Sequence, residues 1–179
     1  MDPLYALPQE ELERRSLEDV QHTIDRLEQS TVPRPDFNLE TFRQGKLQAI
    51  ERFLRDRTLH PGAYRAEALP ELSLPGRSFD LVLSGHLLFG YAPLADGGLH
   101  ARTHFDLAWH RRALSELMRV CNNELRLDPA HTVSSPATVH PYVAPLLADL
   151  PEGWQATLEE TGYDQGFDGE TPMLRLRRI

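Results

Sequence analysis

Hydrophobic residues recur at helical spacing in the first third of the chain. From Pro8 to about Gln29 the apolar residues stand three or four positions apart, and the same spacing returns from about Leu39 to Arg57. This period predicts two amphipathic helices. The stretch from Thr31 to Pro35, which has prolines at its third and fifth positions, separates them. The chain is therefore expected to open with a helical segment.

The hydrophobic pattern changes after His60-Pro61-Gly62, which ends the second helix. The short apolar run from Phe79 to Ser84 is typical of a strand buried on both faces. Ala63 to Ala66 predict a shorter strand, and a proline-rich loop is expected from Leu69 to Arg77. The middle of the chain is therefore expected to contribute strands to a sheet.

Helical and strand patterns alternate in the remainder of the chain. We expect a helix over Phe105 to Val120, a strand over Glu124 to Leu127, a short helix over Pro141 to Leu150, and strands over Gln155 to Glu160 and Met173 to Arg178. Such alternation predicts an α/β fold. We expect a single domain, in which residues 1–62 form a helical N-terminal segment and residues 63–179 supply the strands and the other helices.

Composition narrows the class of protein. The 179 residues are 40% hydrophobic, which suffices for a core, and 27 acidic against 19 basic residues give a net charge of −8. An acidic surface disfavours nucleic acid as a partner. The single cysteine, Cys121, excludes an intrachain disulfide. No apolar run approaches the roughly 18 residues of a membrane span, and the first residues lack the basic region of a signal peptide, so we expect a cytoplasmic protein.

Several segments resemble a known family in their order and spacing. The run P-G-R-S-F-D-L-V-L-S, Pro75 to Ser84, is similar to the fourth strand of Rossmann-like S-adenosylmethionine-dependent methyltransferases, and Gly85 to Phe89 resembles the S-H-x-L-F that ends that strand. Ala113 to Cys121 resembles the family helix A-L-x-E-x-x-R-V, which leads to the fifth strand. The C-terminal pair of strands resembles the antiparallel sixth and seventh strands. The resemblance covers Leu69 to Ile179.

The resemblance also bears on the N-terminus. Met1-Asp2-Pro3-Leu4-Tyr5 resembles the acid followed by P-L-Y that comes after the second strand in some members. The chain would then form a Rossmann-like methyltransferase sheet that lacks its first two strands and is mostly parallel with an antiparallel C-terminal strand. The family's glycine-rich turn, G-x-G-x-G, is absent from the sequence, and Asn122-Asn123 stand in place of its K-P-G-G turn.

The missing strands belong to the centre of the family's sheet, whose order is 3-2-1-4-5-7-6. Their removal would leave the third strand, near Ala63 to Ala66, without its neighbour and would expose an edge of the fourth. Three explanations stay open. The start codon lies upstream, the gene is a decayed remnant, or the gap is closed by pairing of the third strand with the fourth or by a partner chain.

The resemblance implies residues for binding S-adenosylmethionine. Asp2 corresponds to the acid that takes the ribose hydroxyls, but with no strand before it to hold it in place, a solvent-exposed terminal acid or a helix cap is the favoured alternative. Ala68, where an acid is common in the family, and Leu69 would meet the adenine through backbone N–H and apolar contact. No catalytic residue is identified.

Three further candidates follow the best-defined strand. Ser84, Gly85 and His86 lie at its carboxyl end, where ligands of open α/β sheets bind. The imidazole of His86 could contact cofactor or substrate, or act as a base near neutral pH. The alternative is a histidine hydrogen-bonded to a neighbouring loop.

A group of histidines raises the question of a metal site. His100 and His104 are four residues apart, but no Glu follows the first, and His110 lies about 240° around a helix from His104. This spacing favours a solvated loop and helix start, so we predict no metal.

The expected function is transfer of a methyl group from S-adenosylmethionine to an unidentified acceptor, with a small molecule or a protein favoured. Without the glycine-rich turn, we expect the cofactor to bind weakly or not at all, with a Kd at or above ~1 mM. The alternative is an inactive fragment or an interaction module that binds no cofactor. Exposed strand edges make a homodimer plausible.

Overall fold

The computed structural model describes residues 7–29, 33–101 and 104–179. The chain divides into two compact units, Met1–Glu67 and Ala68–Ile179. This boundary is close to the one expected between the helical segment and the rest. The prediction that both belong to one methyltransferase-like domain stays a prediction.

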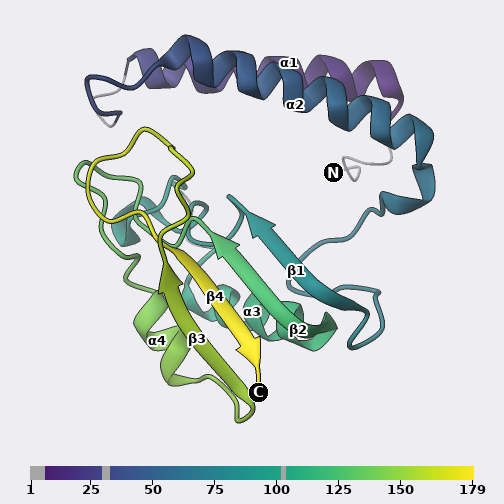
Figure 1. The fold of residues 1–179 in the computed structure, drawn as a ribbon, viewed down its shortest axis with the longest axis vertical. Coiled ribbons are helices and arrows are strands. Elements are labelled where there is room, and N and C mark those ends of the chain that lie inside the picture. Colours follow the sequence, from purple (N-terminus) through teal and green to yellow (C-terminus); the bar gives the residue numbers. More distant parts are fainter. Residues whose placement is uncertain (1–6, 30–32, 102–103) are drawn as a thin grey trace. The chain divides into compact units, whose positions relative to one another are not determined.

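The first unit is a pair of helices, α1 (Gln9–Glu28) and α2 (Leu39–Leu59), which lie side by side (Figure 1). The helix α2 begins at Leu39 because the side chain of Asn38 accepts a hydrogen bond from the backbone N–H of Thr41 at 2.8 Å. Leu12 and Leu54 are buried between the two helices. The amphipathic pattern therefore predicted both helices to within two residues at each end.

The strand expected over Ala63 to Ala66 is absent from the described residues. Pro61–Ala63 form a short 3-10 helix, and the chain then runs irregularly to an isolated bridge between Ala68 and Glu71. A strand needs a hydrogen-bonding neighbour, and none is present for this segment in the part of the chain that the structure describes.

The second unit contains one four-stranded sheet, and this confirms the predicted α/β class. Its strands are β1 (Phe79–Gly85), β2 (Cys121–Asp128), β3 (Trp154–Glu159) and β4 (Met173–Arg178), in the spatial order β1-β2-β4-β3. The strands β1 and β2 are parallel, and β4 is antiparallel to both of its neighbours. The strands β1, β2 and β3 therefore point one way and β4 the other.

One face of this sheet carries the core. The helices α3 (Leu107–Val120) and α4 (Val143–Ala148) lie on the same side of the sheet (Figure 1). The buried side chains of the central strands pack against them; these are Leu125, Leu127, Leu174 and Leu176, each 0% exposed. Alternate residues point to opposite faces of a strand, so the other face presents Glu124, Arg126, Arg175 and Arg177.

The carboxylate of Glu124 joins these charges together. It lies 2.5 Å from the guanidinium of Arg126, 2.7 Å from that of Arg175 and 2.8 Å from that of Arg177. Burial opposes ionisation of Glu124, but the neighbouring guanidinium groups lower its pKa overall. The central strands β2 and β4 are thus apolar on one face of the sheet and charged on the other.

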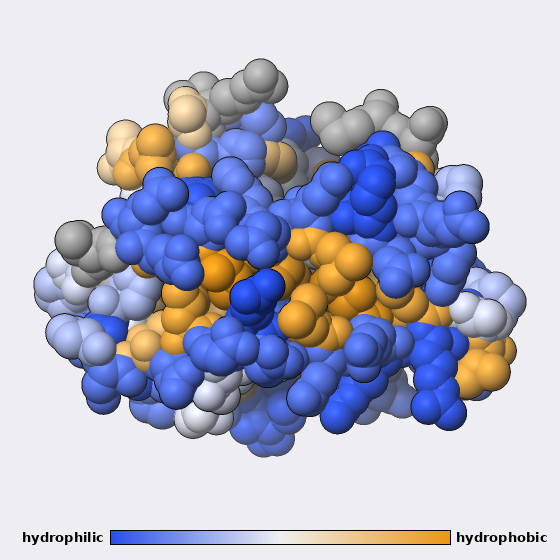
Figure 2. Space-filling model, turned by 90° about the horizontal axis from the view of Figure 1, so that it is seen from above, coloured by the Kyte–Doolittle hydropathy of each residue, from blue (hydrophilic) through white to orange (hydrophobic). Residues whose placement is uncertain are grey.

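The prediction that the run from Phe79 to Ser84 is buried on both faces is wrong. Phe79, Leu81 and Leu83 are 43%, 45% and 65% exposed. Leu81 and Leu83 are in register with Glu124 and Arg126 of β2, so their side chains lie on the face of the sheet opposite α3 and α4. The strand β1 is also at the edge of the sheet, where β2 is its one partner among the described residues. Exposed large apolar residues occur in both units, and Figure 2 shows apolar side chains gathered among hydrophilic ones on the face that it presents.

No helix within the described ranges combines the length and the apolar character that crossing a membrane requires.

Candidate functional site

A pocket of about 420 Å³ opens at the carboxyl ends of β1 and β2. Because the two strands are parallel, both end at the same edge of the sheet, with Gly85 in register with Asp128. The backbone N–H of His86 donates a hydrogen bond of 2.7 Å to the carbonyl oxygen of Asp128, and this fixes the two strand ends together. At His86 the backbone takes a φ of 58°, so the chain turns sharply away from the sheet.

Four parts of the chain supply the pocket wall. The strand β1 contributes Leu83, Ser84 and Gly85, and β2 contributes Arg126 and Asp128. The segment after β3 and the start of β4 complete it with Glu160, Thr161, Tyr163 and Met173. The wall therefore combines apolar side chains with two carboxylates.

Two polar oxygen atoms of this wall are buried and lack a hydrogen-bond partner within the described part of the chain. They are Oγ of Ser84 and Oδ1 of Asp128. Burial raises the pKa of the Asp128 carboxyl, and the rings of His86 and His131 act in the opposite direction. A buried oxygen without a donor costs roughly 1–3 kcal/mol, which favours a ligand that compensates it.

The charge of the pocket is negative. Asp128 and Glu160 bring two carboxylates, while the guanidinium of Arg126 donates to the carboxylate of Glu124 at 2.5 Å. The cation on the wall is paired with an acid outside the pocket, but it shares that carboxylate with Arg175 and Arg177.

The structure brings together only some of the residues expected to bind a cofactor. Ser84 and Gly85 line the pocket, and His86 follows them directly. Ala68 and Leu69 do not line it, and Asp2 lies outside the described residues.

The segment after Leu69 is held at the far end of α3 instead. The backbone N–H of Leu72 donates to the carboxylate of Glu116 at 2.8 Å, and the guanidinium of Arg119 donates to the carbonyl oxygen of Leu74 at 2.8 Å. Glu116 and Arg119 belong to the last two turns of α3, which runs directly into the amino end of β2.

Asp128 and Glu160 were missed by sequence reasoning. The expected fifth strand stopped at Leu127, one residue short of Asp128, although β2 includes it. Glu160 directly follows Glu159, the last residue of β3. The rule that ligands bind at the carboxyl ends of strands, applied to β2 and β3 as well as to β1, would have found both.

A second hollow, of about 480 Å³, lies between α3 and the start of β3. Arg111 and Asp149 on its wall are paired at 2.7 Å, and the guanidinium of Arg178 lies 4.6 Å from the ring centroid of Trp154. None of its lining side chains is among the buried polar groups that lack a partner in the described residues. It also lies at the amino ends of β2 and β3, so the carboxyl-end pocket is the better candidate despite its smaller volume.

The expectation that His110 belongs to a solvated loop and helix start is wrong. His110 is 0% exposed. Its Nε2 accepts a hydrogen bond from the backbone N–H of Phe89 at 3.0 Å, and its Nδ1–H donates to the carbonyl oxygen of Asp106 at 2.9 Å. Both ring nitrogens are therefore satisfied in the neutral ring, and burial lowers its pKa.

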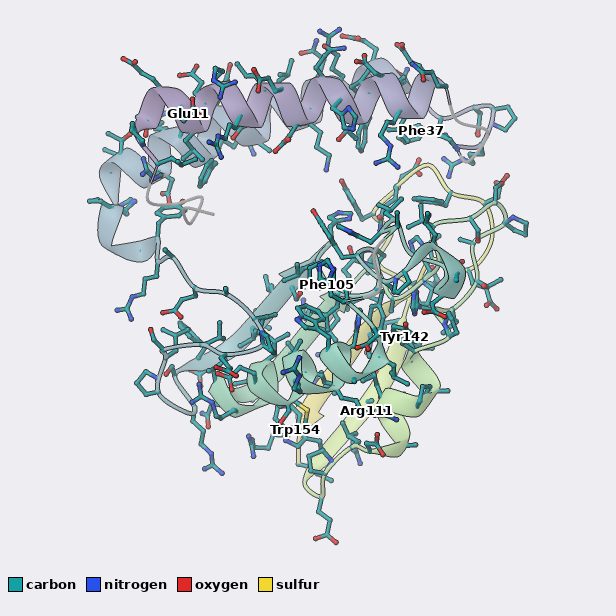
Figure 3. All side chains as sticks on the ribbon, turned by 180° about the vertical axis from the view of Figure 1, so that it is seen from behind. Glu11, Phe37, Phe105, Arg111, Tyr142 and Trp154 are labelled. Atoms are coloured by element: carbon teal, nitrogen blue, oxygen red, sulfur yellow. The ribbon has the colours of Figure 1, made fainter. Side chains whose placement is uncertain are left out.

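Two more histidines of the second unit are buried. His131 and His140 are each 1% exposed, and Nε2 of each lacks a partner in the described residues. The ring of Tyr142, labelled in Figure 3, packs at 5.0 Å from the ring of His110 and 4.9 Å from that of His140. Within the described ranges, no group of three or more His, Cys, Asp or Glu side chains could hold a metal ion.

The described residues do not fit S-adenosylmethionine as a whole. A bound methionine carboxylate needs backbone N–H donors on a tight glycine turn, whereas the pocket presents the carboxylates of Asp128 and Glu160. A Cβ added at Gly85 would meet no atom within 4 Å, so no close backbone approach requires glycine there.

No family model matches the chain, and no curated protein or solved structure matches it.

Proposed function

We propose that Ala68–Ile179 form the carboxyl-terminal half of a Rossmann-like methyltransferase sheet, and that the pocket at its carboxyl edge holds the methyl acceptor. The strand order carries this proposal. The order β1-β2-β4-β3, with β4 antiparallel to its neighbours, corresponds to strands 4-5-7-6 of the family's order 3-2-1-4-5-7-6. The exposed apolar residues of β1 also support it, because the fourth strand of a complete doubly wound sheet has helices over both of its faces and a strand on each side.

The described residues limit the part that this chain takes. They supply a pocket that binds and orients an acceptor, but no cradle for the methionine end of S-adenosylmethionine. Holding an acceptor in a fixed geometry is itself a large part of methyl-transfer catalysis. Methyl transfer would therefore need a cofactor site supplied by residues beyond those described.

A titration with S-adenosylhomocysteine, followed by ¹H–¹⁵N NMR, tests the proposal. We expect small shifts at the amides of Ser84, Gly85 and His86, with a Kd at or above ~1 mM, equivalent to at most about 4 kcal/mol. The end of the fourth strand would still contact the ligand, while the missing cradle keeps affinity low. AMP, which shares the adenosine but has no amino-acid moiety, is the control ligand and is expected to leave these amides in place.

Two results would contradict the proposal. Micromolar binding would mean that a complete cofactor site forms without a glycine-rich turn. Millimolar S-adenosylhomocysteine that leaves Ser84 to His86 unmoved would remove the reason to place this chain in the family.

A second candidate function is supported by the edge of β1. Three large apolar side chains on an edge strand paired on one side favour association with another chain through strand pairing. This candidate needs no cofactor, and it predicts no response of Ser84 to His86 to S-adenosylhomocysteine.

A further inference from the structure

The chemistry of the carboxyl-end pocket identifies the kind of molecule that fits it. Its volume of about 420 Å³ lies within the range of small-molecule sites. It stands at the ends of two parallel strands held in register by the bond from His86 to Asp128, so its floor is rigid backbone rather than a loop. The pocket can therefore hold a small organic molecule in one orientation.

The charged side chains of the pocket wall disfavour an anionic ligand. Asp128 and Glu160 both lie on the wall, and the guanidinium of Arg126 is bound by the carboxylate of Glu124. A carboxylate or phosphate entering the pocket would meet two like charges and one guanidinium, which is already engaged with Glu124. Like charges that face each other across a pocket weaken binding.

The state of Asp128 favours a cation over a neutral molecule. Its Oδ1 is shielded from solvent and has no protein donor in the described residues, so the carboxylate carries a charge that is only partly solvated. The buried Oγ of Ser84, on the neighbouring strand, also lacks a hydrogen-bond partner within the described residues. A positive charge in the pocket compensates the incomplete solvation of the Asp128 carboxylate by Coulomb attraction. Neither Oδ1 of Asp128 nor Oγ of Ser84 has to move for this.

The other residues of the pocket wall indicate the character of the uncharged part of the ligand. Leu83 and Met173 provide apolar surface, and the half-exposed ring of Tyr163 can lie against an aliphatic or aromatic body or against the cation itself. A metal ion is a poorer match, because no group of three or more His, Cys, Asp or Glu within the described ranges is placed to ligate one.

We propose that the pocket formed by Ser84, Asp128, Glu160 and Tyr163 binds an organic amine in its ammonium form, carrying a small apolar body. The role of this amine as the methyl acceptor rests on the proposed function. Its binding does not, because the charge and shape of the pocket are independent of any cofactor.

Three small ligands of nearly equal size separate charge from shape. Benzylamine, benzyl alcohol and benzoate are titrated into the full chain at pH 7 and followed by ¹H–¹⁵N NMR. We expect benzylamine to shift the amides of Gly85, Asp128 and Thr161, and to bind at least tenfold more tightly than benzyl alcohol. Benzoate is expected to leave these amides in place.

Variants test which carboxylates are responsible. Asp128→Asn and Glu160→Gln are each expected to weaken benzylamine binding, Asp128→Asn at least tenfold. Glu152→Gln, which removes the same charge from an exposed residue outside the pocket, is the matched control and should bind as the wild type does. Glu160 is exposed, so its variant keeps the test valid even if Asp128→Asn impairs folding.

The inference fails if benzyl alcohol binds as tightly as benzylamine, if benzylamine shifts none of the three amides, or if both variants bind it as the wild type does. A response to benzylamine without any response to S-adenosylhomocysteine would uphold the amine site and remove only its assignment as a methyl-acceptor site.

Discussion

The chain is expected to lose about 3 kcal/mol of unfolding free energy through His140 alone when the pH falls from 7 to 4. Burial lowers the pKa of His140 from 6.5 to about 4, with a smaller contribution from the nearby His110. Since the pKa is lower in the folded than in the unfolded state, the neutral ring stabilises the fold fully above pH 6.5. This stabilisation is lost as the pH falls toward 4.

The hydrogen bonding of His140 explains the direction of this shift. Its Nδ1 accepts from the backbone N–H of Tyr142 at 3.1 Å, so the neutral ring carries its proton on Nε2. A second proton would have to enter at Nδ1 and displace that bond. The ring of Phe89, 5.2 Å away, leaves the resulting charge in apolar surroundings.

Guanidinium unfolding at several pH values, followed by tryptophan fluorescence, measures the effect. Both tryptophans, Trp109 and Trp154, belong to the second unit, so the signal reports its unfolding. In His140→Asn the side-chain oxygen can still accept from Tyr142, but it does not titrate. We expect this variant to lose about 3 kcal/mol less than the wild type between pH 7 and 4.

The matching control is His104→Asn, at an exposed histidine of the same unit. Its pH dependence should follow that of the wild type. If the curves of the wild type and His140→Asn run parallel from pH 7 to 4, His140 is not held neutral by burial in the fold described here.

Phe89→Ala is expected to lower the unfolding free energy by about 3–5 kcal/mol. Phe89 is 0% exposed and belongs to the core of the second unit. Its ring lies 5.9 Å from that of His110 and 5.2 Å from that of His140. Truncation of Phe89 therefore opens a cavity beside these two buried rings. The remaining rings are fixed by hydrogen bonds to the backbone and cannot easily collapse into this space.

The same substitution at an exposed site gives the control. Phe79→Ala, on the edge strand β1, removes a ring that is 43% exposed and should cost less than about 1 kcal/mol. Guanidinium unfolding of both variants at pH 7 provides the comparison. Equal losses for the two would contradict the division between core and open edge that the structure shows.

Much of the secondary structure is predictable from local patterns. Both long helices, α3 and the two C-terminal strands lie within two residues of their expected bounds, because each has a clear period and a clear stop signal. The α/β class follows from the same alternation.

The errors arise where a residue's surroundings depend on distant parts of the chain. The apolar run of β1 predicts burial only if both faces of the sheet are covered, and this cannot be deduced from the run itself. His110 has the sequence surroundings of an exposed helix start, yet the backbone N–H of Phe89, 21 residues earlier, comes to its ring. The stretch Ala63 to Ala66 has a weak strand pattern and no partner.

The candidate site could be predicted in part. The rule that ligands bind at the carboxyl ends of strands correctly located Ser84 and Gly85 at the pocket. It was not extended to Asp128, although the acid directly follows an expected strand. That Oδ1 of Asp128 is buried without a donor follows from tertiary packing, which no local pattern encodes.

The central claim is that β1 is the outer strand of a sheet that continues beyond it in a complete methyltransferase. Amide hydrogen exchange, measured by NMR at a concentration where sedimentation shows a monomer, tests it most directly. Successive amides of a strand point to opposite sides, so only every second amide of Phe79–Gly85 can bond to β2. We predict alternating protection along β1, with the outward amides exchanging as in an unfolded peptide. Uniform protection of β1 in the monomer would mean that its outer edge is covered, and the claim would be wrong.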